Sequence, residues 1–180
     1  MGKLQTFSIK FGRADRCYVA GEGVTGLVII NLAKEKKVKK VKLKLKGRCE
    51  VRYKEMENDD GEFKLVEKKA KEKYFEYEVK IFEDDYLPCG ETQLPFNFPP
   101  LPGDLPSSYE DSGNGNLVIN IRYYAKCKID SKKGDHETMA LFTVQQKMEL
   151  ESFPDCWERR TAHDDKYICC LCCKYDLIPA

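Results

Sequence analysis

Apolar and polar residues alternate along most of the chain with a period of two, which indicates β-strands rather than helices. Val41, Leu43 and Leu45 alternate with lysines, and after Gly47 the odd-numbered apolar series resumes at Cys49. A glycine at that point predicts a kink or bulge within one long strand. Further strands are predicted by alternating or β-branched residues in segments 7–11, 24–30, 75–81, 117–129 and 138–150.

Turn-forming residues separate these segments. The runs 58–61 and 132–135 have the composition of hairpin tips, and six prolines between 86 and 106 exclude a long helix there. Seven to nine strands with this spacing predict an all-β fold, an antiparallel immunoglobulin-like β-sandwich. The pattern ends near Pro154, so we expect a sandwich domain over residues 1–153 and a cysteine-rich linker or tail over 154–180.

Composition fits this architecture and limits the function. The 180 residues are 42% hydrophobic and 34% charged, with a net charge of +1, which suits one globular domain and does not favour nucleic-acid binding. The longest aliphatic run covers only residues 27–30, and the N-terminal residues lack the apolar segment of a secretory signal. These features predict a cytoplasmic protein.

Five of the nine cysteines lie in the last 25 residues. In the cytoplasm they are expected to be reduced thiols rather than disulfides. Zinc binding with Cys156 or His163 would lack the second C-x-x-C pair of a standard finger, and S-acylation of clustered thiols is the other alternative. The S-acylation candidates are Cys169, Cys170, Cys172 and Cys173.

Catalytic motifs are missing from the sequence. The glycine pattern at 21–26 spells G-x-G-x-x-G, but a β-branched strand follows it where a dinucleotide site needs a helix. The two histidines, His136 and His163, lie in turn-like or tail segments, and no nucleophile has a recognisable base. We therefore expect no enzyme activity, no cofactor and no catalytic metal.

The main charge feature is a run of alternating lysines, Lys40, Lys42, Lys44 and Lys46, which we call the lysine ladder. At a two-residue period these side chains project from one face of a strand, about 7 Å apart. The ladder could attract phosphate groups on peptides or lipids. Alternatively, it is a solvated face whose lysines prevent edge pairing. No aromatic residues interleave with the lysines, which argues against binding of single-stranded nucleic acid.

Four motifs together resemble the arrestin N-terminal domain, in the order of that family. They are the G-E…V-x-G strand entry at 18–26, L-x-L-x-G at 43–47, the F-x-F strand with its prolines at 94–102, and L-P-x-S-[FY]-E at 105–110. The resemblance spans about residues 7–153. Residues 87–91 run directly into the F-x-F strand with no room for a helix, which resembles the α-arrestin branch. The cysteine-rich stretch resembles the run toward a second arrestin domain, which this chain lacks.

The resemblance implies a non-enzymatic adaptor for endocytic trafficking, ubiquitination and signalling. Its expected partners are cytoplasmic tails of membrane proteins, phosphorylated or not, with Lys10 matching basic residues on the family's first strand. HECT-type ubiquitin ligases would bind only through P-P-x-Y motifs in a tail that this sequence does not contain. Recruitment to the plasma membrane or endosomes, with peripheral membrane contact, would follow. The alternatives are a retromer-type sorting-coat subunit and an anionic-lipid-binding module that uses the ladder.

Overall fold

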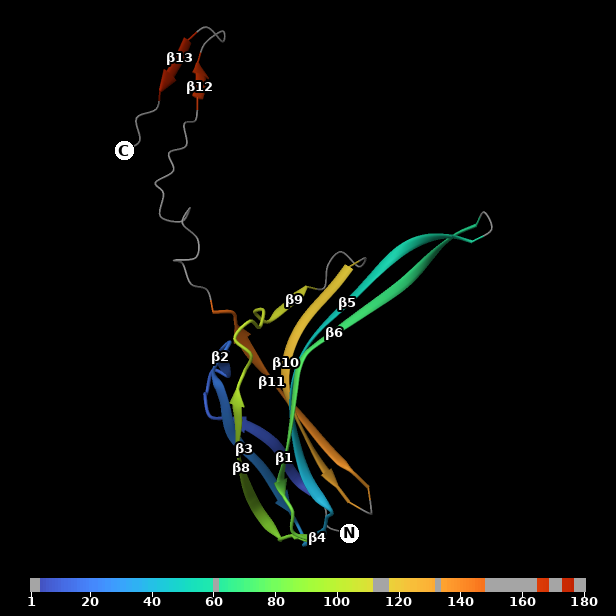
Figure 1. Ribbon diagram of the computed structural model, residues 1–180, viewed down its shortest axis with the longest axis vertical. Helices are drawn as coiled ribbons and strands as arrows, with labels where there is room; N and C mark the ends of the chain where they lie inside the picture. Colours follow the sequence, from blue (N-terminus) through green and yellow to red (C-terminus); the bar gives the residue numbers. More distant parts are fainter. Residues whose placement is uncertain are drawn as a thin grey trace. The chain divides into compact units, whose positions relative to one another are not determined.

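The computed structural model describes residues 4–59, 62–111, 117–131, 134–147, 165–168 and 173–176. The chain forms two compact units, Met1–Lys147 and Met148–Ala180 (Figure 1). The predicted boundary after residue 153 lies outside the described residues.

A small antiparallel sheet forms one layer of the first unit. It consists of β1 (Leu4–Phe11), β3 (Gly23–Leu32) and β8 (Gly90–Pro100), in the order β1-β3-β8. The β-branched run that predicted a buried strand is β3, and the F-x-F segment is β8.

The larger sheet forms the second layer, in the order β2-β11-β10-β5-β6. Its strands are β2 (Cys17–Val19), β11 (His136–Gln145), β10 (Leu117–Asp130), β5 (Lys40–Asp59) and β6 (Glu62–Phe82), and β9 (Tyr109–Asp111) also pairs with β10. The all-β sandwich prediction is confirmed, except that β2 runs parallel to β11.

Eleven strands are described in this unit, more than the seven to nine predicted. The additional strands are short: β2, β9 and the isolated pair of β4 (Lys36–Lys37) with β7 (Tyr86–Leu87). Strands of two or three residues are too short to show a hydrophobic period, so the sequence pattern cannot reveal them.

The core lies between the two sheets and receives one face of each strand. Buried residues from both layers form one cluster, which includes Val28, Ile30, Phe96, Leu43, Leu45, Ala125, Cys127 and Phe142. The ring of Phe11 lies 5.4 Å from that of Phe142, and the ring of Tyr77 lies 6.4 Å from that of Phe98. These aromatic contacts join the small sheet to the large one.

The predicted irregularity at Gly47 is confirmed. The register between β5 and β6 shifts between Gly47 and Arg48. A Cβ atom at Gly47 would lie 2.6 Å from a ring carbon of Phe75 and 2.7 Å from one of Tyr123, so only glycine fits beneath these rings. β10 begins at Leu117, opposite Tyr53. Beyond this pair β5 pairs only with β6 among the described strands, which makes the end of the hairpin a two-stranded arm (Figure 1).

The L-P-x-S-[FY]-E motif has a structural role. The backbone N–H of Val144 donates to Ser108 Oγ (2.9 Å), and the N–H of Ser108 donates to the Val144 carbonyl (2.8 Å). The Pro106 carbonyl accepts a hydrogen bond from the Tyr123 hydroxyl (2.7 Å). The motif therefore ties the segment before β9 to β10 and β11.

Replacing Ser108 by alanine is expected to lower the free energy of unfolding by about 1 kcal/mol, because the Val144 N–H loses its acceptor. Chemical denaturation of the two proteins measures this difference. Ser107 provides a milder comparison, since its hydroxyl accepts from the exposed Gln146 N–H. If Ser107→Ala and Ser108→Ala lowered the free energy of unfolding equally, the assigned role of Ser108 would be contradicted.

The second unit contains the hairpin of β12 (Asp165–Ile168) and β13 (Cys173–Asp176). Cys169, Cys170 and Cys172 lie outside the described residues, and only the backbone of Cys173 is described. The predictions of S-acylation and of reduced thiols at these positions stay predictions.

Candidate functional site

The outer strands of the sheets differ in how readily they could accept an additional strand. β8 contains Pro95, Pro99 and Pro100, which lack backbone donors, and β6 is dense in lysine and glutamate. β1 has neither protection: its sequence LQTFSIKF carries one charge, and among the described strands it pairs only with β3. Eight residues of β1 thus present a long backbone edge.

Lys10 is the single charged residue of this edge. It is exposed and lies opposite Leu27 in the register with β3, whereas its neighbour Ile9 points into the core. Lys10 therefore projects from the outer face of the small sheet. The ladder lies on the outer face of the large sheet, so the structure does not bring the predicted lysines together.

Each lysine of the ladder lies near a carboxylate on an adjacent strand. Lys42 pairs with Glu78, Lys44 with both Glu76 (3.2 Å) and Glu78 (2.7 Å), and Lys46 with Glu76 (3.1 Å). Lys40 lies 3.8 Å from Asp130. The interpretation that these lysines prevent edge pairing is wrong, because β5 lies between β10 and β6 and is not an edge strand.

The ion pairs also shift the pKa values of these groups. Hydrogen bonds from Lys42 and Lys44 lower the pKa of Glu78 to about 2, and those from Lys46 and Lys44 lower the pKa of Glu76. A free phosphate would have to compete with these carboxylates for each lysine. Phosphate binding by the ladder stays a prediction, and these carboxylates would compete with the phosphate.

Beyond Gly47 the same outer face carries a different arrangement, centred on Glu50. Its side chain is only 9% exposed and contacts Arg52 (2.7 Å), Lys69 (3.0 Å), Arg48 (3.9 Å) and Lys71 (3.9 Å). Hydrogen bonds from Lys69 and Arg52 lower the pKa of Glu50 to about 2. Four cationic side chains from two strands thus surround the Glu50 carboxylate.

The low pKa of Glu50 predicts a pH dependence of stability. Its contribution is complete above the ordinary pKa of 4.5 and is lost as pH falls toward about 2. We expect wild type to unfold at higher temperature than Glu50→Gln near neutral pH, with the gap closing between pH 4.5 and 2. Thermal unfolding of both proteins across that range tests this, and a gap that stays constant would contradict it.

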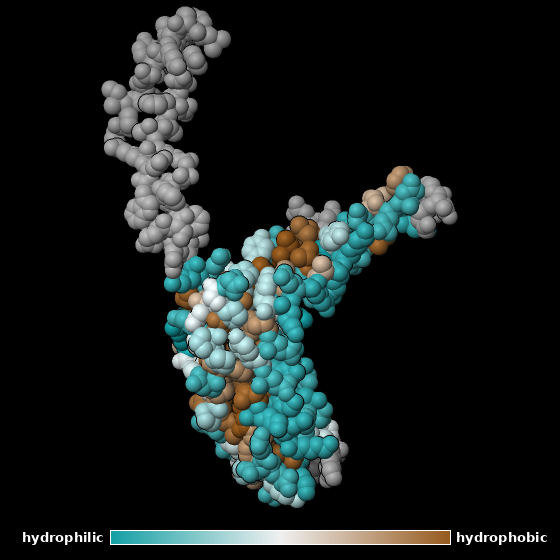
Figure 2. All heavy atoms as spheres, viewed as in Figure 1, coloured by the Kyte–Doolittle hydropathy of each residue, from teal (hydrophilic) through white to brown (hydrophobic). Residues whose placement is uncertain are grey.

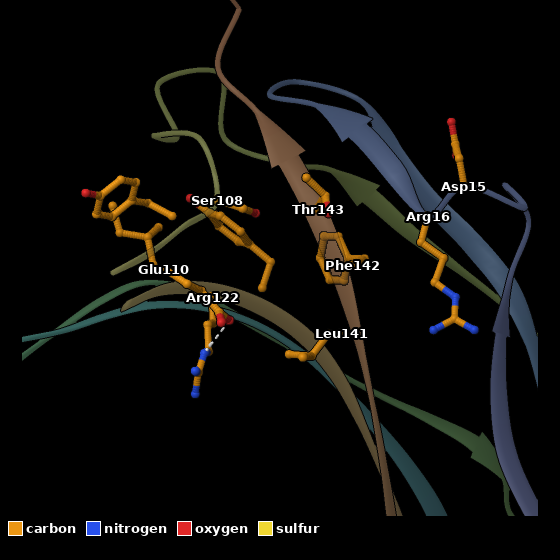
Figure 3. A pocket seen from close by; sticks show the side chains of 11 residues that line it. Asp15, Arg16, Ser108, Glu110, Arg122, Leu141, Phe142 and Thr143 are labelled. Carbon is orange, nitrogen blue, oxygen red and sulfur yellow. Dashed lines mark hydrogen bonds and ion pairs between the residues drawn. The ribbon is translucent and has the colours of Figure 1, made fainter. Parts of the chain in front are cut away.

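A cavity of about 390 Å³ opens beside β10, where β9 and β11 leave part of its edge uncovered (Figure 3). Asp15 and Arg16 approach it from one side and Glu110 and Arg122 from the other, the latter two joined by a 2.7 Å ion pair. Ser108 contributes a hydroxyl to this wall, but its oxygen accepts from Val144 and no histidine lines the cavity. The two acidic and two basic side chains of the lining therefore balance, and the lining contains no nucleophile–base pair.

Metal-binding clusters and membrane-spanning helices are both missing from the part of the chain that the structure describes. No group of three or more His, Cys, Asp or Glu side chains there could hold a metal ion. Likewise, none of the described segments is a helix long and apolar enough to span a membrane.

Comparison with known families supports the resemblance read from the motifs. Residues 7–151 match the family described as arrestin (or S-antigen), N-terminal domain. The chain belongs to the arrestin family. This arrestin-family chain is 29% identical to mouse arrestin domain-containing protein 1, in an alignment that covers 92% of the present chain. It is 28% identical to arrestin domain-containing protein 17 of Caenorhabditis elegans, in an alignment that covers 97% of the present chain. These relatives place it in the arrestin domain-containing, or α-arrestin, branch.

The chain spans 36% of the mouse relative and 42% of the nematode one. Among solved structures, the Bacillus subtilis sporulation control protein Spo0M is similar, with a TM-score of 0.51 at 18% identity. That match covers 88% of this chain and 58% of the other, and it shows a shared fold alone.

Sequence patterns did not reveal the cluster around Glu50. The residues of the cluster do follow a two-residue period in the sequence. Arg48, Glu50 and Arg52 continue the period of the ladder past Gly47, and Lys69 and Lys71 alternate in the same way. What the pattern lacked was the pairing of β5 with β6, which places these two series side by side on one face.

Proposed function

We propose that this chain is a non-enzymatic adaptor module that binds an extended segment of a membrane-protein tail along the edge of β1. The observation that carries the proposal is the length of that edge, eight residues without proline and with a single charge. An extended peptide gains main-chain hydrogen bonds from such an edge and specificity from alternate side chains. Membership of the arrestin family supports an adaptor role.

The outer side of the edge offers further contacts. Thr6, Ser8 and Lys10 alternate along β1 and lie on the face opposite the core. A bound peptide would place every second side chain next to them. Lys10 would then lie beside a phosphate at one peptide position, which gives phosphorylated tails an added charge-assisted contact. The module would work in the cytoplasm, with recruitment to the plasma membrane or endosomes for endocytic trafficking and ubiquitination.

The experiment is a binding screen of synthetic cytoplasmic-tail peptides of membrane proteins, each with and without phosphoserine. Lys10→Gln is expected to weaken binding of a phosphorylated peptide by up to about fivefold, the range of an exposed ion pair. Binding of its unphosphorylated form should be unchanged.

The matched control is Lys40→Gln, which also removes one lysine, from the other sheet. Loss of phosphopeptide affinity in Lys40→Gln but not in Lys10→Gln would move the phosphate contact to the ladder. If no tail peptide binds the wild-type chain, the proposed function itself fails.

A further inference from the structure

The two faces of the β5–β6 hairpin beyond Gly47, which includes the two-stranded arm, differ in charge. We call the outer-facing residues of β5 and β6 beyond Gly47, with Arg122 and Glu110 beside them, the arm face. It carries seven cations and three anions: Arg48, Arg52, Lys54, Lys69, Lys71, Lys73 and Arg122 against Glu50, Glu67 and Glu110. The opposite face of the described arm carries Lys64 and Lys68 against Glu55, Glu57 and Glu72. The excess of four positive charges is therefore confined to one side.

Arginines converge at the end of the arm face next to Gly47. Arg48, Arg52 and Arg122 line a recess of about 60 Å³ together with Glu50 and Asn120. Arg52 is held by Glu50 and Arg122 by Glu110, both at 2.7 Å, whereas Arg48 is 3.9 Å from its nearest carboxylate. A planar guanidinium presents a fork of donors that matches phosphate oxygens. The recess thus places three such groups around a space open to an oxyanion.

The outer end of the same face is apolar. Met56 lies directly opposite Leu65, and Phe63 follows on the same side of the hairpin. Their exposed fractions are 59%, 60% and 69%. Figure 2 shows hydrophobic residues near the end of the arm among hydrophilic ones. Met56 is four residues beyond Arg52 and eight beyond Arg48. The apolar group therefore lies about 13 Å from Arg52 and about 26 Å from Arg48 along the strand.

From these observations we propose that the arm face is a contact surface for membranes that contain anionic phospholipids. The basic residues bind headgroup phosphates, and Met56, Phe63 and Leu65 enter the boundary between headgroups and acyl chains. Exposed apolar side chains gain from leaving water there, and each nearby basic residue adds attraction to the anionic surface. A phosphorylated peptide would satisfy the arginines but would leave the apolar group in water, so the combination favours a lipid surface.

This site lies on the outer face of the large sheet, away from the β1 edge, and does not depend on the proposed tail binding. It also differs from the ladder in charge balance. The four lysines of the ladder are paired with three carboxylates, Glu76, Glu78 and Asp130, whereas the arm face has four more cations than anions. Lipid binding through the ladder stays the alternative prediction.

Sedimentation of the full 180-residue chain with vesicles tests the proposal. The vesicles contain phosphatidylcholine with phosphatidylserine, or phosphatidylcholine alone, over a range of salt concentrations. One variant carries Arg48→Gln, Lys71→Gln and Lys73→Gln, which leaves Arg52 and Lys69 in place to hold Glu50. Its matched control carries Lys40→Gln, Lys42→Gln and Lys46→Gln, with the same charge removed from the ladder.

Wild type is expected to bind the anionic vesicles, with binding that fades as salt rises. The arm-face variant should bind about 100-fold more weakly, at about fivefold for each basic residue. The ladder variant should bind like wild type. Met56→Ser with Leu65→Ser should also weaken binding, whereas Met139→Ser with Leu141→Ser, similarly exposed on β11, should not. Thermal unfolding confirms that each variant is folded.

Three results would overturn the proposal. The first is a wild-type chain that does not sediment with anionic vesicles. The second is an equal loss in the arm-face and ladder variants, which would indicate only a response to net charge. The third is a wild-type chain that binds a phosphoserine peptide through the arm-face residues but does not bind anionic vesicles.

Discussion

Replacing Tyr123 by alanine is expected to lower the free energy of unfolding by about 4 kcal/mol, the largest single-residue effect that we predict. Tyr123 is fully buried, with its ring 6.0 Å from the rings of both Phe75 and Phe142. Its removal leaves a cavity where β5, β6 and β11 meet β10. Because small domains are stable by only about 5–15 kcal/mol, much of the fold's stability would be lost. Urea denaturation measures the change.

Tyr123→Phe is the control for this prediction. It keeps the ring and removes only the 2.7 Å hydrogen bond to the Pro106 carbonyl, so we expect a loss of about 1 kcal/mol. If the phenylalanine variant lost as much stability as the alanine variant, the hydrogen bond rather than the ring would hold this part of the core.

Gly26→Ala is expected to cost about 3 kcal/mol of stability, because the new methyl group has no space. Its Cβ atom would lie 2.6 Å from a ring carbon of Phe96 and closer still to the backbone carbonyl of Lys10. A backbone atom in a paired strand cannot move aside as a flexible side chain can. The substitution would push β1 away from β3 and so also weaken any peptide bound along β1.

Gly103→Ala tests whether this cost comes from crowding. No atom lies within 4 Å of the Cβ position at Gly103, and its replacement should change the stability by less than about 0.5 kcal/mol. Thermal unfolding of the two alanine variants gives the comparison. Similar losses in both would contradict the assignment of the Gly26 effect to close packing of β1, β3 and β8.

The long strands could be predicted from sequence because burial on one face imposes a two-residue period. Val41, Leu43 and Leu45 face the core, and the register shifts at Gly47 as expected, with the extra residue, Tyr74, on β6. The short strands β2 and β4 could not be predicted, since two or three residues show no period. The parallel pairing of β2 with β11 depends on long-range contacts that local patterns do not contain.

The basic sites show the same limit. The ladder was visible as a run of lysines on one strand, but Glu76 and Glu78 from β6 pair with three of its four lysines. Around Glu50 the cations outnumber the carboxylates, although no single segment there is as basic as the ladder. Electrostatic character therefore depends on cross-strand pairing, which is set by the register of the sheet.

The central claim, that β1 accepts an added strand, is tested most directly by amide hydrogen exchange. The exchange of each β1 amide is measured with and without a tail peptide that binds in the screen. We predict slower exchange along Leu4–Phe11 on binding, with little change along β6 and β8, whose edges carry charges and prolines. Protection at β6 or β8 instead, or binding without protection at β1, would contradict the account.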